Sequence, residues 1–321
     1  MEFRNLGASG LKVSPLCLGT GFRGHWHGLV EEQSCTEIVR RAIDLGCNFV
    51  DCANYYFQGR CETIVGNALE DLNSVRNNLV ITSKVWSKIG PGPNDQGLSR
   101  YHIMREIERS LRRLKTDHID IYLLHAFDPE TPLEETLRTM DDLIAQGKTR
   151  YVGCCNFTSA QVVESLWISD VNNLQPYVCV QNEYNLFKRE IEKELFSRCR
   201  QHGLGLMTYS PLAVGLLTGN IRRGQTPPNT SVWSQKEDFE GEISIFDDLI
   251  QVLIDMADEL GKTPAQVAVA WILDHPEVSS AIIGPDLPEH VDEVFGAIGW
   301  ILPDDVRKKL DETFEPVCTS T

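Results

Sequence analysis

The chain has 321 residues, of which 42% are apolar and 24% are charged, so it can bury a large core. Its formal net charge of −16 disfavours binding to nucleic acid phosphate or to anionic membranes, and favours small-molecule ligands. No apolar run approaches the ~20 residues that span a bilayer, and the N-terminus lacks the basic and apolar pattern of a secretory signal.

The ten cysteines are scattered along the chain rather than paired. No Cys-x-x-Cys spacing occurs, and Cys154 and Cys155 are adjacent, which suits neither a zinc site nor a redox pair. We therefore expect reduced, mostly buried thiols in a cytoplasmic protein.

Short apolar runs alternate with segments of mixed apolar and charged spacing, a pattern typical of alternating strands and helices. Strands are expected at residues 16–18, 48–50, 79–81, 119–124, 151–154, 178–180, 204–208 and 281–283. Helices are expected at residues 33–45, 61–72, 100–114, 133–146, 158–167, 189–202, 246–260 and 288–297. The eight alternations predict an α/β fold, a closed (β/α)8 TIM barrel, as one domain over residues 1–321.

Two further segments fall outside the repeating units. Residues 3–6 and 11–13 flank a Gly-Ala-Ser-Gly turn, which predicts an N-terminal β-hairpin that closes the lower end of the barrel. Residues 215–245, rich in Gly, Pro, Thr and Asn, predict a long loop after the seventh strand, and long loops in compact domains often act as lids.

Polar residues stand at the ends of the expected strands, and in such barrels the strand ends and following loops form the active face. These residues are Asp51, Lys84, His125, Asn156, Gln181, Tyr209 and Gly284.

Four of the polar groups suit the reduction of a carbonyl by hydride. Negative charge grows on the substrate oxygen, so a proton donor must lie within ~3 Å of it. Tyrosine titrates near ~10, and a nearby lysine cation, held by a carboxylate, lowers the pKa of the phenol. Tyr56, Lys84 and Asp51 supply these groups, and His125 can orient the carbonyl. The alternative is a buried structural Asp–Lys pair beside a core His and Tyr.

The motifs identify a family resemblance. They include DCANYY at 51–56, ITSKVW at 81–86, DIYLLH at 120–125, GCCNF at 153–157, QNEYN at 181–185 and YSPL at 209–212. Together they resemble the aldo-keto reductase superfamily over essentially the whole chain. The resemblance implies a barrel that binds a nicotinamide cofactor, NAD(P)(H), without a Gly-x-Gly-x-x-Gly loop, and none follows a strand here. It also implies Tyr56, rather than Tyr55, as general acid, with Asp51, Lys84 and His125 as partners.

The same resemblance implies a set of cofactor contacts. Asn156 and Gln181 would hold the carboxamide, and Tyr209 would stack on the nicotinamide. The full expected set is Gly19, Thr20, Gly21, Asp51, Asn156, Gln181, Tyr209, Ser210, Leu212, Gly215, Ile283, Gly284, Asp286, His290 and Glu293.

Some positions depart from the family pattern. Cys155 replaces the serine that commonly precedes the carboxamide asparagine, and Asp286 stands where NADPH-preferring relatives have a basic or hydroxyl side chain. An aspartate repels a 2′-phosphate but accepts a hydrogen bond from a 2′-hydroxyl, which favours NAD(H). Arg222 or Arg223 remains an alternative source of charge for a phosphate.

Aromatic residues in the strand-end loops are expected to bind the substrate. They are Trp26, Phe57, Trp86, Phe127 and Trp233. A lone tryptophan more often packs beneath a loop, but Trp86 shares the side of the strand that carries Lys84. His25 and His27 lack a clear third ligand, so no metal is expected; with Arg23 and Asp128 they can instead contact a hydroxylated or anionic substrate.

The sequence therefore predicts an NAD(P)-dependent oxidoreductase that interconverts an aldehyde or ketone and an alcohol. With NAD as cofactor, an NAD-dependent sugar or polyol dehydrogenase working in oxidation is an alternative. A dinucleotide-binding, redox-sensing regulatory subunit, as in channel-associated relatives, is an alternative from another class. A phosphate-binding barrel isomerase would leave Asn156, Gln181 and Tyr209 unexplained. The substrate and the oligomeric state stay open.

Overall fold

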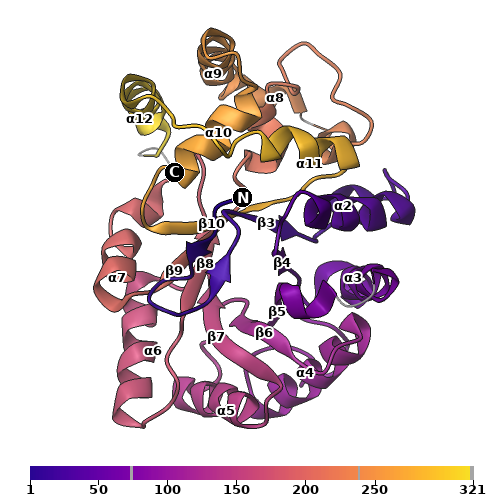
Figure 1. The fold of residues 1–321 in the computed structure, drawn as a ribbon, viewed down its shortest axis with the longest axis vertical. Coiled ribbons are helices and arrows are strands. Elements are labelled where there is room, and N and C mark those ends of the chain that lie inside the picture. The colour runs from indigo at the N-terminus through magenta and orange to yellow at the C-terminus, as the bar shows by residue number, and fades with distance from the viewer. Residues whose placement is uncertain (73–74, 238, 319–321) are drawn as a thin grey trace.

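The computed structural model describes residues 1–72, 75–237 and 239–318. Eight parallel strands close into a barrel in chain order, with β10 pairing back to β3, and helices surround it (Figure 1). The strands are β3 (Leu16–Gly19), β4 (Phe49–Asp51), β5 (Val80–Val85), β6 (Ile119–Leu124), β7 (Thr149–Cys155), β8 (Cys179–Glu183), β9 (Gly205–Tyr209) and β10 (Val278–Ile283). The predicted (β/α)8 TIM barrel is confirmed.

Helices connect successive strands on the outside of the barrel. The longer ones are α2 (Glu32–Asp44), α3 (Arg60–Asp71), α4 (Arg100–Leu114), α5 (Leu133–Ala145), α6 (Ser159–Val171), α7 (Leu195–His202), α9 (Asp247–Glu259), α10 (Pro264–Leu273), α11 (Pro288–Phe295) and α12 (Asp304–Cys318). Short ones are α1 (Arg23–Trp26), α8 (Phe239–Ser244), and the 3-10 turns η1 (Tyr56–Gly59), η2 (Val75–Asn78), η3 (Glu190–Glu192), η4 (Ala213–Thr218) and η5 (Val232–Gln235).

Three helical segments differ from the sequence prediction. The helix expected over 189–202 is divided into η3 and α7. No range was predicted for helix α10, because all its residues except Gln266 are apolar, and such a helix lacks an amphipathic period. Helix α12 lies beyond the eight strand–helix units on which the prediction was built.

The predicted N-terminal hairpin is present as β1 (Arg4–Asn5) and β2 (Lys12–Val13), paired antiparallel. Leu6 and Val13 are fully buried and join the apolar cluster inside the barrel, which includes Ile121 and Met207. The turn requires glycine at Gly7, because φ is +58° and an added Cβ would lie 2.4 Å from the Gly203 carbonyl oxygen. The hairpin thus closes the end of the barrel opposite the carboxyl ends of the strands.

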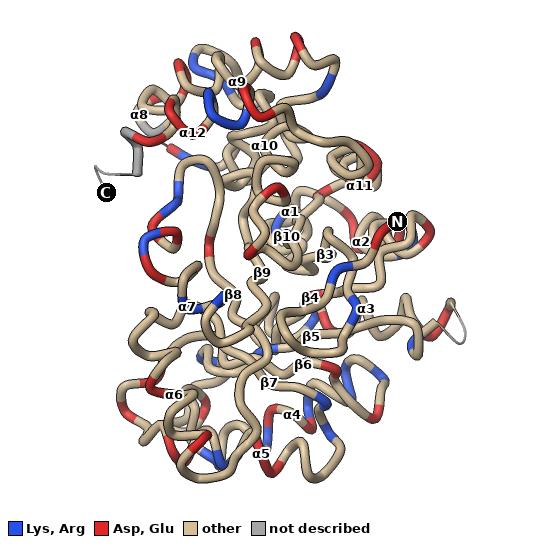
Figure 2. Tube along the Cα trace, turned by 60° about the vertical axis from the view of Figure 1, so that its left-hand side comes forward, with Lys and Arg blue, Asp and Glu red and all other residues tan. Residues whose placement is uncertain are grey.

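The segment between β9 and β10 is the long connection expected after the seventh strand, and it contains η4, η5 and α8 before α9 and α10. Charged residues lie mostly on the outer helices and loops (Figure 2). No helix in the described part of the chain is both long enough and apolar enough to cross a membrane. The nine cysteines whose side chains the structure describes are free and buried.

Candidate active site

A cavity of about 600 Å³ opens where the barrel strands end. Most of the residues singled out from the sequence line it, although they come from all parts of the chain. They are Gly19, Gly21, Arg23, Trp26, Asp51, Tyr56, Trp86, His125, Asn156, Gln181, Tyr209, Ser210, Leu212, Gly215, Ile283, Gly284, Asp286, His290 and Glu293. Parallel strands bring these residues together because their carboxyl ends share one rim.

Lys84 lies at the centre of the polar group. Its side chain is fully buried, and its Nζ donates to Asp51 Oδ2 at 2.5 Å, to the Cys52 carbonyl at 2.9 Å and to the Tyr56 hydroxyl at 3.0 Å. Burial lowers the pKa of Lys84, but the charges of Asp51 and Tyr56 outweigh burial and raise it. The ammonium group is therefore a fixed cation that touches the phenol.

Asp51 is held by more than its ion pair with Lys84. Its Oδ1 accepts hydrogen bonds from Thr82 Oγ1 at 2.6 Å and from Gln181 Nε2 at 2.9 Å. Strand register explains the Thr82 contact, because Asp51 pairs with Thr82 across β4 and β5. One carboxylate oxygen thus accepts from the Lys84 cation and the other from two neutral donors, so both oxygens are satisfied, as a buried charge requires.

The electrostatics of Tyr56 differ from the sequence expectation. Burial raises the pKa of Tyr56 to about 12; Lys84 lowers it, but Asp51 raises it again. The lysine therefore acts in the expected direction but does not bring the phenol below its ordinary pKa, because burial is the larger effect. At neutral pH the hydroxyl carries its proton and is ready to donate it.

His125 lies beside the phenol, with its ring centroid 5.9 Å from that of Tyr56 and an edge-on orientation. Burial, together with the Lys84 cation, lowers the pKa of His125 to about 3. The imidazole is therefore neutral at physiological pH, and its Nδ1 is buried without a partner in the described structure. A neutral ring can donate one hydrogen bond and accept another.

Amide and aromatic groups follow on the next strands. Asn156, in the left-handed region with φ of 59°, donates from Nδ2 to the His125 carbonyl at 2.9 Å. The Tyr209 hydroxyl donates to Asn156 Oδ1 at 2.9 Å. Because the same cavity holds carboxamide partners (Asn156, Gln181), an aromatic face (Tyr209) and, farther along, carboxylates that can accept hydroxyl hydrogen bonds, its donor set fits a nicotinamide dinucleotide.

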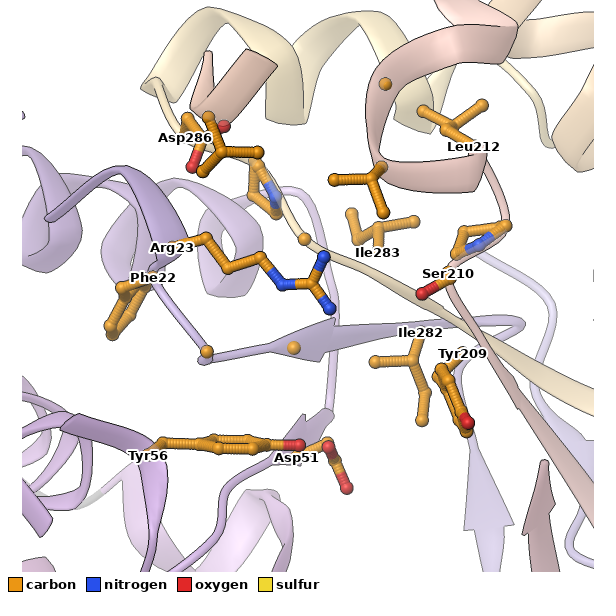
Figure 3. A pocket seen from close by; sticks show the side chains of 18 of the residues that line it. Phe22, Arg23, Asp51, Tyr56, Tyr209, Ser210, Leu212, Ile282, Ile283 and Asp286 are labelled. Carbon is orange, nitrogen blue, oxygen red and sulfur yellow. The ribbon is translucent and has the colours of Figure 1, made fainter. Parts of the chain in front are cut away.

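Asp286 occupies the cavity wall far from Tyr56 (Figure 3). Its Oδ1 accepts a hydrogen bond from the Gly24 amide at 3.0 Å. Burial raises the pKa of Asp286, whereas the Gly24 amide and His290 lower it. Arg222 is held by Asp247, with Nε 2.7 Å from Oδ1, and does not line the cavity.

Some expected residues lie behind the cavity wall. Thr20 is buried and donates from Oγ1 to the Asp51 carbonyl at 3.0 Å. Phe57 stacks on Trp26 with ring centroids 6.1 Å apart. Phe127 packs edge-on against Phe157, with ring centroids 5.4 Å apart.

Trp233, expected in the lid, is 7% exposed, and its Nε1 donates to the Val214 carbonyl at 2.9 Å. Phe57, Phe127 and Trp233 are not among the residues that line the cavity. Trp233 instead ties η5 to η4 within the long connection after β9.

Other residues also line the cavity, and the sequence alone had not assigned them to the site. Tyr55 packs edge-on against Trp26, with ring centroids 5.4 Å apart. The long connection also contributes small polar and apolar residues, which carry no motif of their own: Thr218, Asn220, Ile221, Pro228, Thr230, Ser231 and Val232. For Tyr55, the available signal was its place beside Tyr56 in the DCANYY block.

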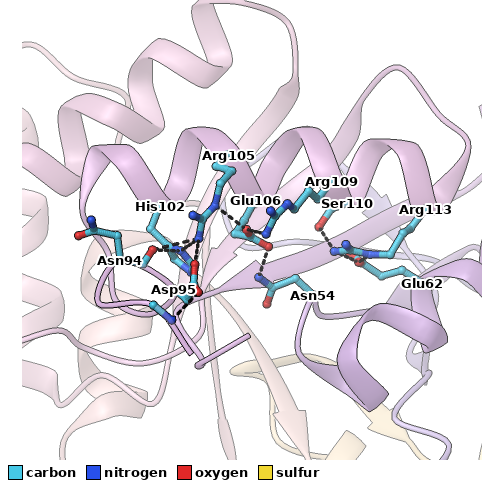
Figure 4. A network of polar contacts seen from close by, with 11 residues as sticks. Asn54, Glu62, Asn94, Asp95, His102, Arg105, Glu106, Arg109, Ser110 and Arg113 are labelled. Carbon is cyan, nitrogen blue, oxygen red and sulfur yellow. Dashed lines mark hydrogen bonds and ion pairs between the residues drawn. The ribbon is translucent and has the colours of Figure 1, made fainter. Parts of the chain in front are cut away.

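A buried polar network supports the loop between Asp51 and Tyr56 from outside the barrel (Figure 4). In this loop, the Asn54 amide N–H donates to the Lys84 carbonyl at 3.3 Å, and Asn54 Nδ2 donates to Glu106 Oε2 at 3.3 Å. Glu106, on α4, is buried and pairs with Arg109 at 2.9 Å and Arg105 at 3.2 Å. The network fixes the backbone that carries the candidate proton donor.

Comparison with known proteins agrees with this geometry. The Aldo/keto reductase family model, which describes NAD(P)-dependent carbonyl oxidoreductases in general, matches residues 15–315. A probable voltage-gated potassium channel subunit beta from Arabidopsis thaliana is 38% identical over 94% of this chain and 92% of its own length. Its counterpart from Oryza sativa subsp. japonica is 36% identical over the same shares, 94% and 92%. A putative voltage-gated potassium channel subunit beta from Schizosaccharomyces pombe is 35% identical over 97% and 93%. The chain therefore belongs to the aldo/keto reductase family.

Proposed function

We propose that the protein is an NAD(P)-dependent oxidoreductase that interconverts a small aldehyde or ketone and the corresponding alcohol, with Tyr56 as general acid and base. The observation that carries this proposal is the contact of one buried ammonium group, Lys84 Nζ, with both Asp51 and the Tyr56 hydroxyl. That hydroxyl faces a cavity that can hold a carbonyl compound beside a nicotinamide ring.

In the reducing direction, a bound nicotinamide cofactor supplies the hydride. The residues of the chain manage the charge that develops on the substrate oxygen. Tyr56 donates its proton to that oxygen, and the Lys84 cation stabilises the phenolate that remains. Neutral His125 offers a hydrogen bond that orients the carbonyl without competing as an acid, since its pKa is lowered to about 3.

In the oxidising direction, the phenolate of Tyr56 takes the alcohol proton. Because the pKa of Tyr56 is raised to about 12, this direction gains from alkaline conditions. Oxidation of a sugar or polyol uses the same groups and is the alternative substrate assignment.

We propose NAD(H) as the preferred cofactor. A carboxylate at Asp286 disfavours a 2′-phosphate and can accept a hydrogen bond from a 2′-hydroxyl. The position of the alternative cations supports this preference, because Arg222 is paired with Asp247 and Arg223 lies 3.8 Å from Asp248. Neither arginine lines the cavity.

The direct test is turnover of a panel of aldehydes and ketones with NADH and NADPH, by wild type and by Tyr56→Phe. We expect the variant to lose turnover by at least about a hundredfold, the lower end of the contribution of a general acid. Cofactor affinity should stay nearly unchanged, because the phenylalanine keeps the ring. Retained turnover in the variant would exclude Tyr56 as the proton donor.

The names of the similar plant and yeast proteins favour a second candidate function, a dinucleotide-binding regulatory subunit that reports redox state to a partner. Such a protein would retain its cofactor tightly through purification and turn over slowly. Fast turnover on a small carbonyl with readily exchanged cofactor would count against this candidate. The cytoplasmic location expected from the free thiols stays a prediction.

A further inference from the structure

One cation, Arg23, lies inside the cavity. Arg23 projects from α1 into the cavity, and its guanidinium points toward Ser210 and Tyr209 (Figure 3). It lies between Asp286 on one side and Tyr56 on the other. Within the part of the chain that the structure describes, no hydrogen bond or ion pair engages this guanidinium.

The backbone that carries Arg23 is fixed on both sides. Phe22, which precedes it, is buried and adopts the left-handed conformation with φ of 41°, a costly one for a bulky residue. Gly24, which follows it, donates its amide to Asp286 Oδ1 at 3.0 Å. Buried packing and a tertiary hydrogen bond thus hold α1 at the edge of the cavity, so the direction of the arginine is built into the fold.

The lining of the cavity is acidic apart from this arginine. Its lining carries three carboxylates, Asp51, Asp286 and Glu293, and Lys84 is enclosed behind the wall. Among the described lining residues, Arg23 is the one side chain with a permanent positive charge. A nicotinamide dinucleotide brings two negative phosphates into this acidic surrounding, and desolvated charges require partners.

We infer that Arg23 binds the two phosphates at the middle of the dinucleotide. Its guanidinium lies between the catalytic end, marked by Tyr56, and the far end, marked by Asp286, which is where the phosphates of a cofactor spanning the two would lie. Guanidinium presents a planar fork of donors that matches phosphate oxygens. The inference rests on the proposed function and adds the residue that neutralises the cofactor. An anionic group of the substrate has the same chemistry, and the experiment separates the two.

The test uses fluorescence titration of the full chain with NADH, at low and at physiological ionic strength. Arg23→Gln should weaken NADH binding by roughly tenfold to a hundredfold, which corresponds to about 1.4–2.8 kcal/mol. The binding of the variant should also depend less steeply on salt, because one charge contact is gone. Arg23→Lys keeps the charge but loses the planar fork of donors, so its NADH affinity should lie between those of the wild type and Arg23→Gln.

The matched control is Arg198→Gln, because Arg198 is exposed on α7, its guanidinium donates to Gln201 Oε1 at 3.0 Å, and it does not line the cavity. It should bind NADH as wild type does. Unchanged NADH affinity in Arg23→Gln would overturn the inference.

If the NADH affinity of Arg23→Gln is unchanged and its KM is raised for p-carboxybenzaldehyde but not for benzaldehyde, the inference is overturned and Arg23 is assigned to an anionic group of the substrate. If wild type itself binds neither NADH nor NADPH, the proposed function fails, and the inference fails with it. The titration of the wild-type chain therefore distinguishes the two failures.

Discussion

Replacing Lys84 by Met tests whether the Lys84 cation stabilises the buried Asp51 carboxylate. The substitution keeps an unbranched side chain of similar length but removes all three hydrogen bonds from Nζ, to Asp51, to Cys52 and to Tyr56. Asp51 is 2% exposed and would keep only the neutral donors Thr82 and Gln181. Its carboxylate would remain buried without a counterion.

Removing one partner of a buried pair costs about 3–5 kcal/mol, a large share of the ~5–15 kcal/mol that stabilises a typical domain. We expect the free energy of unfolding of Lys84→Met to fall by that amount. Lys148→Met is the matched control: its Nζ lies 2.6 Å from Glu108, but the pair is partly exposed and should contribute about 0–1 kcal/mol.

The assay is urea unfolding followed by far-UV circular dichroism at neutral pH. The double variant Asp51→Asn/Lys84→Met removes both charges. Its loss in free energy of unfolding should be smaller than the summed losses of the two single variants by at least about 1 kcal/mol. Strict additivity, or a loss in Lys84→Met no greater than in Lys148→Met, would refute the electrostatic account. Any residual oxidation activity of Lys84→Met should also require more alkaline pH, because the cation that lowers the pKa of Tyr56 is absent.

The remaining predictions concern proton transfer and cofactor choice. Because the pKa of Tyr56 is raised to about 12, the phenolate fraction grows roughly tenfold per pH unit below that value, so kcat for alcohol oxidation should rise from neutral to alkaline pH while kcat for reduction changes little. An oxidation rate that is flat over this range would contradict the assignment of Tyr56 as base. Since the pKa of His125 is lowered to about 3, neither direction should show a break near pH ~6, where an ordinary histidine titrates, and a break there would show a charged imidazole. Asp286→Ser should move the ratio of NADH to NADPH affinities toward NADPH; an unchanged ratio would remove Asp286 from cofactor selection.

The strand-end residues were predictable because a parallel barrel converts sequence position into spatial position. Asp51, Lys84 and His125 each follow an apolar run, and closure of the sheet is sufficient to place them on one rim. The hydrogen bonds that Asp51 accepts from Thr82 and Lys84 depend on strand register, which pairs Asp51 with Thr82 and which apolar runs do not specify.

Loop residues were less predictable, because left-handed backbone turns redirect their side chains. Phe57 and Gln58 have φ of 46° and 53°, and Phe57 therefore packs on Trp26 instead of lining the cavity. The burial of Trp233 depends on a hydrogen bond to Val214, a contact between two parts of one connection. No period or propensity in the sequence encodes such contacts.

The network that joins Asn54 to α4 has a consequence for how the protein can be altered. Arg105 and Arg109 are partly exposed and do not line the cavity, yet through Glu106 and Asn54 they support the loop that ends at Tyr56. Natural drift or directed evolution at these two arginines would therefore change the rate of the chemical step while every residue in contact with the ligand stayed the same. Libraries built only around the cavity would miss this second, peripheral route to altered activity.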